Sequence, residues 1–156
     1  MSQPISAVPL HHDRHACVDP RMRAMVDNVL LGSPVARALG VRLESLAPDH
    51  VELEMPFLPT NVTHGSVVHG GVIATLIDIA GAAAAASGAS ADEVKGGATS
   101  SLSIQYLAPA RGAALRAVAV VVRRGRKQVV MDVSVYAEAP DGGVLVAKAL
   151  MSSAMF

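Results

Sequence analysis

Residues 69–81 read HGGVIATLIDIAG, an apolar stretch that holds one carboxylate, Asp78. Alanines follow at 82–86, so a helix over these residues is apolar on every face and must be buried on all sides. Burying an ionised carboxylate is costly unless it is paired or hydrogen-bonded. Asp78 is therefore our first candidate for a functional residue, and the helix around it decides the fold.

The rest of the chain predicts elements that can cover this helix. Apolar residues at helical spacing predict a helix over 21–31, and Ser33-Pro34 begins a short second helix that ends at Gly40. Alternating patterns and turn residues predict strands at 41–46, 51–57, 98–107, 113–122, 128–139 and 144–155. The connections among the last four strands are too short for a crossover helix, which predicts an antiparallel meander. The expected fold class is α+β, a curved antiparallel sheet wrapped around one long central helix.

Length and composition narrow the class of protein. The chain has 156 residues, enough for one well-buried core, and we expect a flexible tail over 1–20 and a single domain over 21–156. Thirteen basic residues balance thirteen acidic ones, which leaves no overall charge to attract nucleic acid or an anionic membrane. A neutral, apolar-rich protein of this size tends to associate with itself, so a homo-oligomer is expected. The single cysteine, Cys17, excludes a disulfide within the chain.

The N-terminal residues and the longest apolar run bear on where the protein is expected to be located. The N-terminal residues MSQPISAVPLHHDRH have no basic region followed by an apolar core, so no secretory signal is expected. The longest apolar run, 71–86, is shorter than the roughly 20 residues of a membrane span and contains Asp78. We expect a cytoplasmic protein that does not enter a membrane.

Two glycines stand directly before the central helix. The first N–H groups of a helix lack partners within it, and without a Cβ the backbone of Gly70 and Gly71 lets a ligand approach closely. Such an N–H can hold a developing oxyanion. His69 is more typical of a capping or orienting residue than of a metal ligand, and it forms with His64 a pair that lacks a third ligand nearby. No metal site is expected.

The spacing of the two candidate groups favours a site built from two chains. Gly70 and Asp78 are eight residues apart, which is about 12 Å along a helix axis. One Asp78 therefore cannot easily act on the same substrate atom as the start of its own helix. A dimer that brings two of these helices together removes the difficulty.

These motifs resemble a known family. The stretch VVHGGVIATLIDIAGAA and the later segment TSSLSIQYLAPARGAALRAVAVVVRRGRKQVVMDVSVY are similar to hotdog-fold acyl-CoA thioesterases of the PaaI type, and the resemblance covers about residues 35–156. It implies a hotdog fold and hydrolysis of an acyl-CoA thioester to a free acid and coenzyme A. It also implies that no cofactor is needed and that the chain forms a homodimer or a dimer of dimers, a homotetramer.

The resemblance also implies roles for individual residues. Asp78 matches the catalytic acid, which acts as general base on water or as nucleophile on the thioester. Gly70 matches the glycine whose N–H polarises the thioester carbonyl, and the two residues come from opposite subunits. Thr99 falls where relatives often carry a hydroxyl that positions water. His69 and Gly71 complete the HGG segment, where we expect them to contact the substrate.

At one position the chain departs from the family pattern. Many relatives have an asparagine six residues before the histidine of HGG, where it holds water or the carbonyl. Thr63 occupies that position here, with Asn61 two residues earlier and His64 next to it. Either Asn61 or His64 can fill the role.

The densest basic cluster surrounds Gly125 and consists of Arg123, Arg124, Arg126 and Lys127. Taken alone, such a cluster is typical of a solvated hairpin tip. In a thioesterase, however, the phosphates of coenzyme A need cationic partners, and Arg is suited to bidentate phosphate contacts. The resemblance places this turn near the nucleotide, so we predict that it binds acyl-CoA.

Two other functions fit the same fold. A hotdog hydratase or dehydratase acts on enoyl or hydroxyacyl thioesters, but such relatives generally use a histidine with an acid in a different motif. The central helix offers Asp78 no partner of that kind. A non-catalytic acyl-CoA-binding module is the second alternative, favoured if the change at Thr63 has disabled water activation. Thioester hydrolysis is the main prediction.

Overall fold

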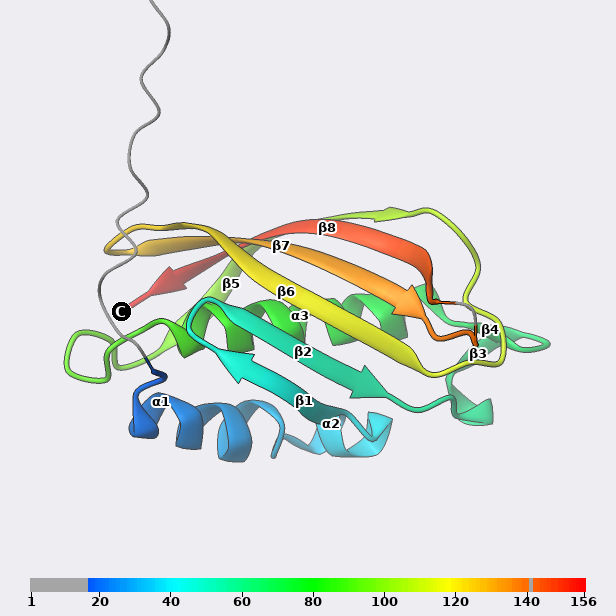
Figure 1. The fold of residues 1–156 in the computed structure, drawn as a ribbon, viewed down its shortest axis with the longest axis horizontal. Helices are drawn as coiled ribbons and strands as arrows, with labels where there is room; N and C mark the ends of the chain where they lie inside the picture. The colour runs from blue at the N-terminus through cyan, green and yellow to red at the C-terminus, as the bar shows by residue number, and fades with distance from the viewer. Residues whose placement is uncertain (1–16, 141) are drawn as a thin grey trace, which may run out of the picture.

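The computed structural model describes residues 17–140 and 142–156, and Figure 1 shows how their helices and strands are arranged. The predicted flexible tail falls mostly on residues 1–16, which lie outside the described residues. The helical elements are α1 Pro20–Met25, η1 Val26–Leu30, α2 Pro34–Leu39, η2 Pro59–Asn61 and α3 Gly70–Ser87. The strands are β1 Arg42–Ala47, β2 His50–Met55, β3 Val62–His64, β4 Val67–Val68, β5 Gly97–Tyr106, β6 Leu115–Arg124, β7 Gln128–Ala137 and β8 Val144–Met155.

α3 forms the centre of the fold. It contacts every strand of the large sheet and also packs against α1 and η1, and the sheet curves across it in Figure 1. By length and composition alone this helix could cross a membrane, but 61% of it is buried inside the protein, as in the core helix of a globular domain. At Gly81 the helix approaches β8 so closely that a Cβ atom would collide with Met151. The predicted buried helix is therefore confirmed.

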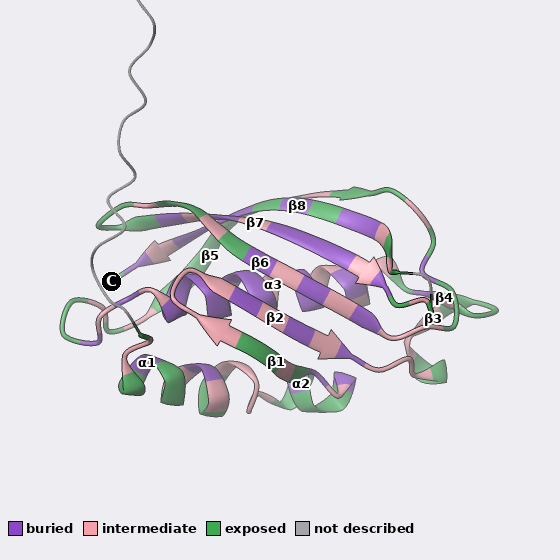
Figure 2. Ribbon diagram, in the orientation of Figure 1, coloured by how far each residue is buried: buried purple, intermediate pink, exposed green. Residues whose placement is uncertain are grey.

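The large sheet is antiparallel and has the order β1-β2-β6-β7-β8-β5. Alternate apolar residues of each strand face α3, for example Val51, Leu53 and Met55 of β2, which are fully buried. Figure 2 shows this alternation as bands of buried and more exposed residues along β2 and β6. The predicted class, an α+β fold with a curved antiparallel sheet around one helix, is confirmed.

The predicted meander of the last four strands is wrong for β5. Strands β6, β7 and β8 pair in sequence, but β5 pairs with β8 at the edge of the sheet, and β6 pairs with β2. The connection over 107–114 makes this possible, because crossing three strand spacings needs about 14 Å, which eight extended residues easily span. Its path is fixed where the N–H of Val68 donates to the carbonyl of Ala110 at 3.0 Å.

Two local features also differ from the sequence-based prediction. The segment 58–68, for which the sequence predicts neither helix nor strand, contains η2 and a small sheet formed by β3 and β4. The expected helix over 21–31 changes from α-helix to π-helix at Val26, whose carbonyl accepts the N–H of Leu31. The strands β3 and β4 have three and two residues, and η1 is a single π-helical turn. Elements this short leave no recognisable period in the sequence.

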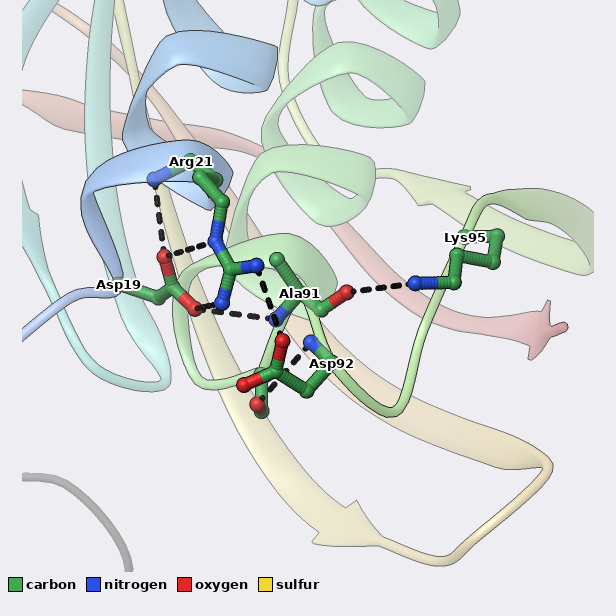
Figure 3. Close-up of polar contacts among 6 residues, drawn as sticks. Asp19, Arg21, Ala91, Asp92 and Lys95 are labelled. Atoms are coloured by element: carbon green, nitrogen blue, oxygen red, sulfur yellow. Dashed lines mark hydrogen bonds and ion pairs between the residues drawn. The ribbon is translucent and has the colours of Figure 1, made fainter.

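Asp19 fastens α1 to the segment after α3, as Figure 3 shows. Its carboxylate accepts the N–H of Arg21 at 2.9 Å and the N–H of Ala91 at 3.0 Å. The guanidinium of Arg21 pairs with Asp19 and also donates to Asp92 at 2.9 Å. The N–H groups of Ala91 and Arg21, followed by the guanidinium, lower the pKa of Asp19 from 3.8 to about 2. Packing of the domain therefore extends to Asp19, just before the predicted boundary at residue 21.

We expect the attachment through Asp19 to weaken in acid. The pKa of Asp19 in the folded protein is about 2, which is below the unfolded value of 3.8. The charged carboxylate therefore contributes its full stabilisation well above pH 3.8, and this contribution is lost as the pH falls toward 2. The measurement is the melting temperature of the wild type and of Asp19→Asn as a function of pH. The difference between the two should be constant near neutral pH and shrink below about pH 4. A difference that stays constant into the acid range would contradict a role for the Asp19 charge.

Candidate active site

Hydrogen bonds to the preceding segment, and within the turn itself, hold the first turn of α3. The N–H of His69 donates to the carbonyl of Asn61 at 2.8 Å. His69 is the N-cap of α3, and its Nδ1 accepts the N–H of Gly71 at 2.8 Å. Among the residues that the structure describes, the N–H of Gly70 donates no hydrogen bond. Gly70 thus has a free donor at the helix start, whereas the donor of Gly71 is used by the cap.

Asp78 lies about two turns further along α3 and is half-buried. The hydroxyl of Thr99, on β5, donates to its Oδ1 at 2.7 Å. No other residue in the described part of the chain donates to this carboxylate, so Oδ2 is available to a substrate or a water molecule. The sequence predicted that Thr99 positions water. In the structure its hydroxyl contacts the carboxylate itself, which fixes the orientation of Asp78.

Beyond its first turn, α3 is exposed along one stripe only. The partly exposed positions follow helical spacing and are Ala74, Thr75, Asp78 and Ala82. The stripe lies against β5, the edge strand, which pairs with β8 on one side and with no other strand in the described protomer. Asp78 therefore opens toward an unpaired sheet edge.

A pocket of about 410 Å³ lies beside the start of α3. Its walls come from α3, from the β3–β4 segment and from the chain around the end of β5, namely Thr63, Val67, Val68, Gly70, Ile73 and 106–110. None of these side chains is charged, so the pocket suits an uncharged and mainly apolar group. Asp78 of the same chain does not line it.

Asn61 and His64, the two alternatives for the missing asparagine, have different surroundings. Asn61 is half-buried beside His69, and its Nδ2 is buried without a hydrogen-bond partner among the described residues. His64 is exposed at the end of β3. A buried amide without a partner costs free energy, so the side chain of Asn61 is a candidate for contacting a ligand or a second chain.

No cluster of metal-ligating side chains occurs within 17–140 and 142–156, where three or more His, Cys, Asp or Glu residues never converge. His69 uses its Nδ1 to cap α3. The absence of a metal from the reaction remains a prediction from the sequence.

The basic turn between β6 and β7 divides into two parts. Arg123, Arg126 and Lys127 are exposed. Arg124 is half-buried, and its guanidinium donates to Asp49 Oδ1 at 2.9 and 2.5 Å and to a carbonyl in the last turns of α3 at 2.9 Å. A cation is favourable at the carbonyl end of a helix, so Arg124 closes the C-terminal end of α3. Its Nε and Nη2 donors are thus engaged within the fold, and its predicted contact with the nucleotide stays a prediction.

One contact at the site was missed by the sequence analysis. Tyr106, the last residue of β5, donates its hydroxyl to the carbonyl of Gly70 at 2.9 Å, and it lines the pocket. The available signal was weak: one of only two tyrosines in the chain, at the end of a predicted strand and directly before the residues LAPA. Neither feature indicates a partner on α3.

Comparisons with known proteins show the family and the fold. The profile of the thioesterase superfamily matches residues 65–144, which contain α3 and the site residues on it. A predicted esterase of Saccharolobus solfataricus is 31% identical over 126 residues, which cover 80% of this chain and 79% of that protein.

Solved structures share the fold. A thioesterase family protein from Silicibacter pomeroyi has a TM-score of 0.80 at 27% identity, covering 86% of this chain and 98% of its own. The PaaI protein of the E. coli phenylacetic acid degradation operon has a TM-score of 0.73 at 24% identity, covering 86% and 89%. A hypothetical thioesterase with coenzyme A from Streptococcus pneumoniae has a TM-score of 0.65 at 24% identity, covering 74% and 85%. The resemblance to PaaI-type proteins is thereby confirmed, and the chain belongs to the thioesterase superfamily, with the hotdog fold.

Proposed function

We propose that this protein hydrolyses an acyl-CoA thioester to a free carboxylic acid and coenzyme A, as a cytoplasmic homo-oligomer. Membership of the thioesterase superfamily supports thioester hydrolysis as the class of reaction. The observation that carries the assignment is the Asp78 carboxylate, which Thr99 orients on a helix whose start keeps the free N–H of Gly70. An anchored carboxylate and a free backbone donor are the two groups that acyl transfer to water requires.

In the proposed reaction the Gly70 N–H donates to the thioester carbonyl oxygen and stabilises the negative charge that develops there. Asp78 acts in one of two ways. As general base it takes a proton from water while the water oxygen attacks the carbonyl carbon; the C–S bond then breaks and the leaving thiolate takes a proton. As nucleophile it forms a mixed anhydride with release of the thiolate, and water then cleaves the anhydride. Thr99 fixes the carboxylate in both cases.

Two protomers supply each proposed site. Within one chain, Gly70 and Asp78 are about 12 Å apart along α3, too far for both to reach one thioester group. The stripe that contains Asp78 faces the unpaired edge of β5, and a second copy that pairs there brings a second α3 close to it. With two antiparallel α3 helices side by side, Asp78 of one chain faces Gly70 of the other, and a dimer holds two equal sites.

The exposed cations of the basic turn are the proposed partners of the coenzyme A phosphates. Arg124 anchors this turn to the carbonyl of Ala85, which lies about 10 Å along α3 beyond Asp78 and about 22 Å from Gly70. The turn therefore lies nearer to the carboxylate than to the helix start of its own chain. The solved S. pneumoniae relative with coenzyme A supports the ligand class. The proposal assigns the contact to Arg123, Arg126 and Lys127.

We expect Asp78→Asn to lower the rate of hydrolysis by at least about 10²-fold, the scale of a lost general base. Asparagine keeps the shape of the side chain and can still accept the Thr99 hydroxyl, but it takes no proton and does not attack the thioester. The measurement is thiol release from a panel of acyl-CoAs. Asp132→Asn is the matched control, because Asp132 pairs with Lys148 on the opposite face of the sheet.

Near-normal turnover of Asp78→Asn would show that Asp78 is structural and that this mechanism is wrong. A wild type that binds acyl-CoA in a melting assay without releasing thiol would instead support a binding module. Hydration of an enoyl-CoA without thiol release would support the hydratase alternative.

We expect the pair of changes Arg123→Ala and Arg126→Ala to weaken the use of acyl-CoA. Exposed ion pairs contribute about 0.2–1 kcal/mol each, so KM should rise by about 2- to 30-fold. An acyl-pantetheine substrate, which lacks the nucleotide, should be nearly unaffected, and the loss for acyl-CoA should shrink as salt screens the phosphate contacts. Equal losses for the two substrates would argue against a nucleotide contact at this turn.

We expect mixed dimers to reveal whether the site is shared. Gly70→Pro removes the N–H at the first position of α3, where proline is well tolerated, and His69 already has the extended conformation that a following proline requires. Homodimers of Gly70→Pro and of Asp78→Asn should both be nearly inactive. A heterodimer of the two should recover about half of the wild-type activity, because one of its two sites combines an intact Asp78 with an intact Gly70.

The control for this experiment is a heterodimer of Asp78→Asn with a chain that carries both substitutions, which contains no intact site. It should stay as inactive as the homodimers. If the first heterodimer, verified as folded and mixed, fails to regain activity, or if a wild-type monomer is fully active, the shared site is wrong.

A further inference from the structure

The backbone polar groups of Gly70 and Gly71 are engaged in hydrogen bonds, with one exception. The Gly71 N–H donates to His69 Nδ1, the Gly71 carbonyl accepts the hydroxyl of Thr75 at 2.9 Å, and the Gly70 carbonyl accepts the hydroxyl of Tyr106 at 2.9 Å. Of the backbone N–H and carbonyl groups of these two glycines, only the Gly70 N–H lacks a partner among the described residues. A full set of neighbouring bonds leaves this donor little freedom to turn away from a substrate.

We propose that Tyr106 is a positioning residue. Its hydroxyl holds the carbonyl of Gly70 and so limits backbone rotation at Gly70, which keeps the Gly70 N–H turned toward the thioester oxygen. The inference rests on the proposed thioester hydrolysis. Glycine has more backbone freedom than any other residue, and the first turn of a helix is prone to fray. Two successive glycines therefore need a contact on each side of Gly70 to keep one orientation. On the N-terminal side the carbonyl of His69 accepts the N–H groups of Val72 and Ile73. On the C-terminal side Tyr106 holds the carbonyl of Gly70.

The position of Tyr106 is itself set by the sheet. Tyr106 pairs with Ala147 in the ladder between β5 and β8, seven residues along β5 from Thr99. One edge strand thus bonds to a group of each of the two proposed sites: Thr99 holds the carboxylate of Asp78, and Tyr106 holds the carbonyl of Gly70. A shift of β5 would therefore disturb both sites of the dimer.

The ring of Tyr106 has a separate role from its hydroxyl. Tyr106 remains 53% exposed although its hydroxyl is bonded, and it forms part of the wall of the pocket beside Gly70. Its ring atoms lie 3.5 Å from the place that a Cβ of Gly70 would occupy, so the ring covers one side of this peptide. The hydroxyl should therefore affect the chemical step, and the ring should affect substrate binding as well.

Steady-state kinetics of Tyr106→Phe and Tyr106→Ala tests this proposal. Removing a whole oxyanion donor costs about 10²–10³ in kcat, so releasing the donor from its fixed orientation in Tyr106→Phe should lower kcat by a smaller factor, about tenfold. KM should stay within about twofold, because the ring remains in the pocket. Tyr106→Ala should show the same loss in kcat together with a raised KM.

The matched control is Tyr136→Phe, which removes the hydroxyl of the other tyrosine. Tyr136 lies on β7 and packs against Arg116, whose guanidinium is 5.0 Å from the ring centre. This variant should keep the wild-type kcat and KM. Amide hydrogen exchange over 71–74 provides a second measurement, and exchange should be faster in Tyr106→Phe than in the wild type and in Tyr136→Phe.

A wild-type kcat in Tyr106→Phe, alongside an inactive Asp78→Asn, would overturn the role of Tyr106 and leave thioester hydrolysis intact. Faster exchange over 71–74 with an unchanged kcat would overturn it equally, because the hydroxyl would then stabilise the helix start without serving the reaction. A wild type that releases no thiol from any acyl-CoA would remove the proposed function, and this inference with it.

Discussion

The helix α3 must be buried on every side but one, and the rest of the structure follows from this requirement. Its residues are almost all Ala, Gly, Ile, Leu and Val, and water on any broad face of it would be costly. Six strands wrap across it, and α1 with η1 covers part of what the sheet leaves open. Small residues on the helix let the strands approach closely, as at Gly81, where Met151 fills the space of a side chain. With aromatic residues at only 3% of the chain, the core reaches close packing through this short distance between helix and strands.

Beyond the first turn of α3, the open stripe is the only place on the helix where a carboxylate avoids full burial. Asp78 occupies it, reaches water and the Thr99 hydroxyl, and leaves the buried faces wholly apolar. The stripe borders β5, whose outer edge is long and has no partner strand in the described protomer. Long unpaired edges invite pairing with another chain. The open side of α3 next to the edge of β5 thus allows a charge on the helix and also favours a second copy of the protein beside it.

The sequence predicted the helix, the strands and the fold class because each leaves a clear pattern of burial. It predicted Gly70 and Asp78 as candidates since a carboxylate in an apolar helix and glycines at its start are local signals. The place of β5 was not predictable in this way, because strand order depends on where the connection over 107–114 crosses the fold. The roles of Arg124 and Tyr106 depend on partners that lie 75 and 36 residues away, at Asp49 and Gly70. No periodicity within a segment reports such contacts.

The two ends of α3 show how the chain separates stability from chemistry. At the C-terminal end, the guanidinium of Arg124 and the hydroxyl of Ser87 donate to the last carbonyls, and a positive charge there is favourable for the helix dipole. Asp49, in a left-handed conformation at φ 64°, holds Arg124 in place, so this end is closed within the protomer. At the N-terminal end, the His69 cap satisfies Gly71 and leaves Gly70 alone. A helix start attracts negative charge through its dipole and its free donors. Closing that end as completely as the other would strengthen the helix, but it would remove the donor that the proposed reaction requires. Under the proposed function, the open N–H of Gly70 is therefore the point where the fold gives up stability for a site.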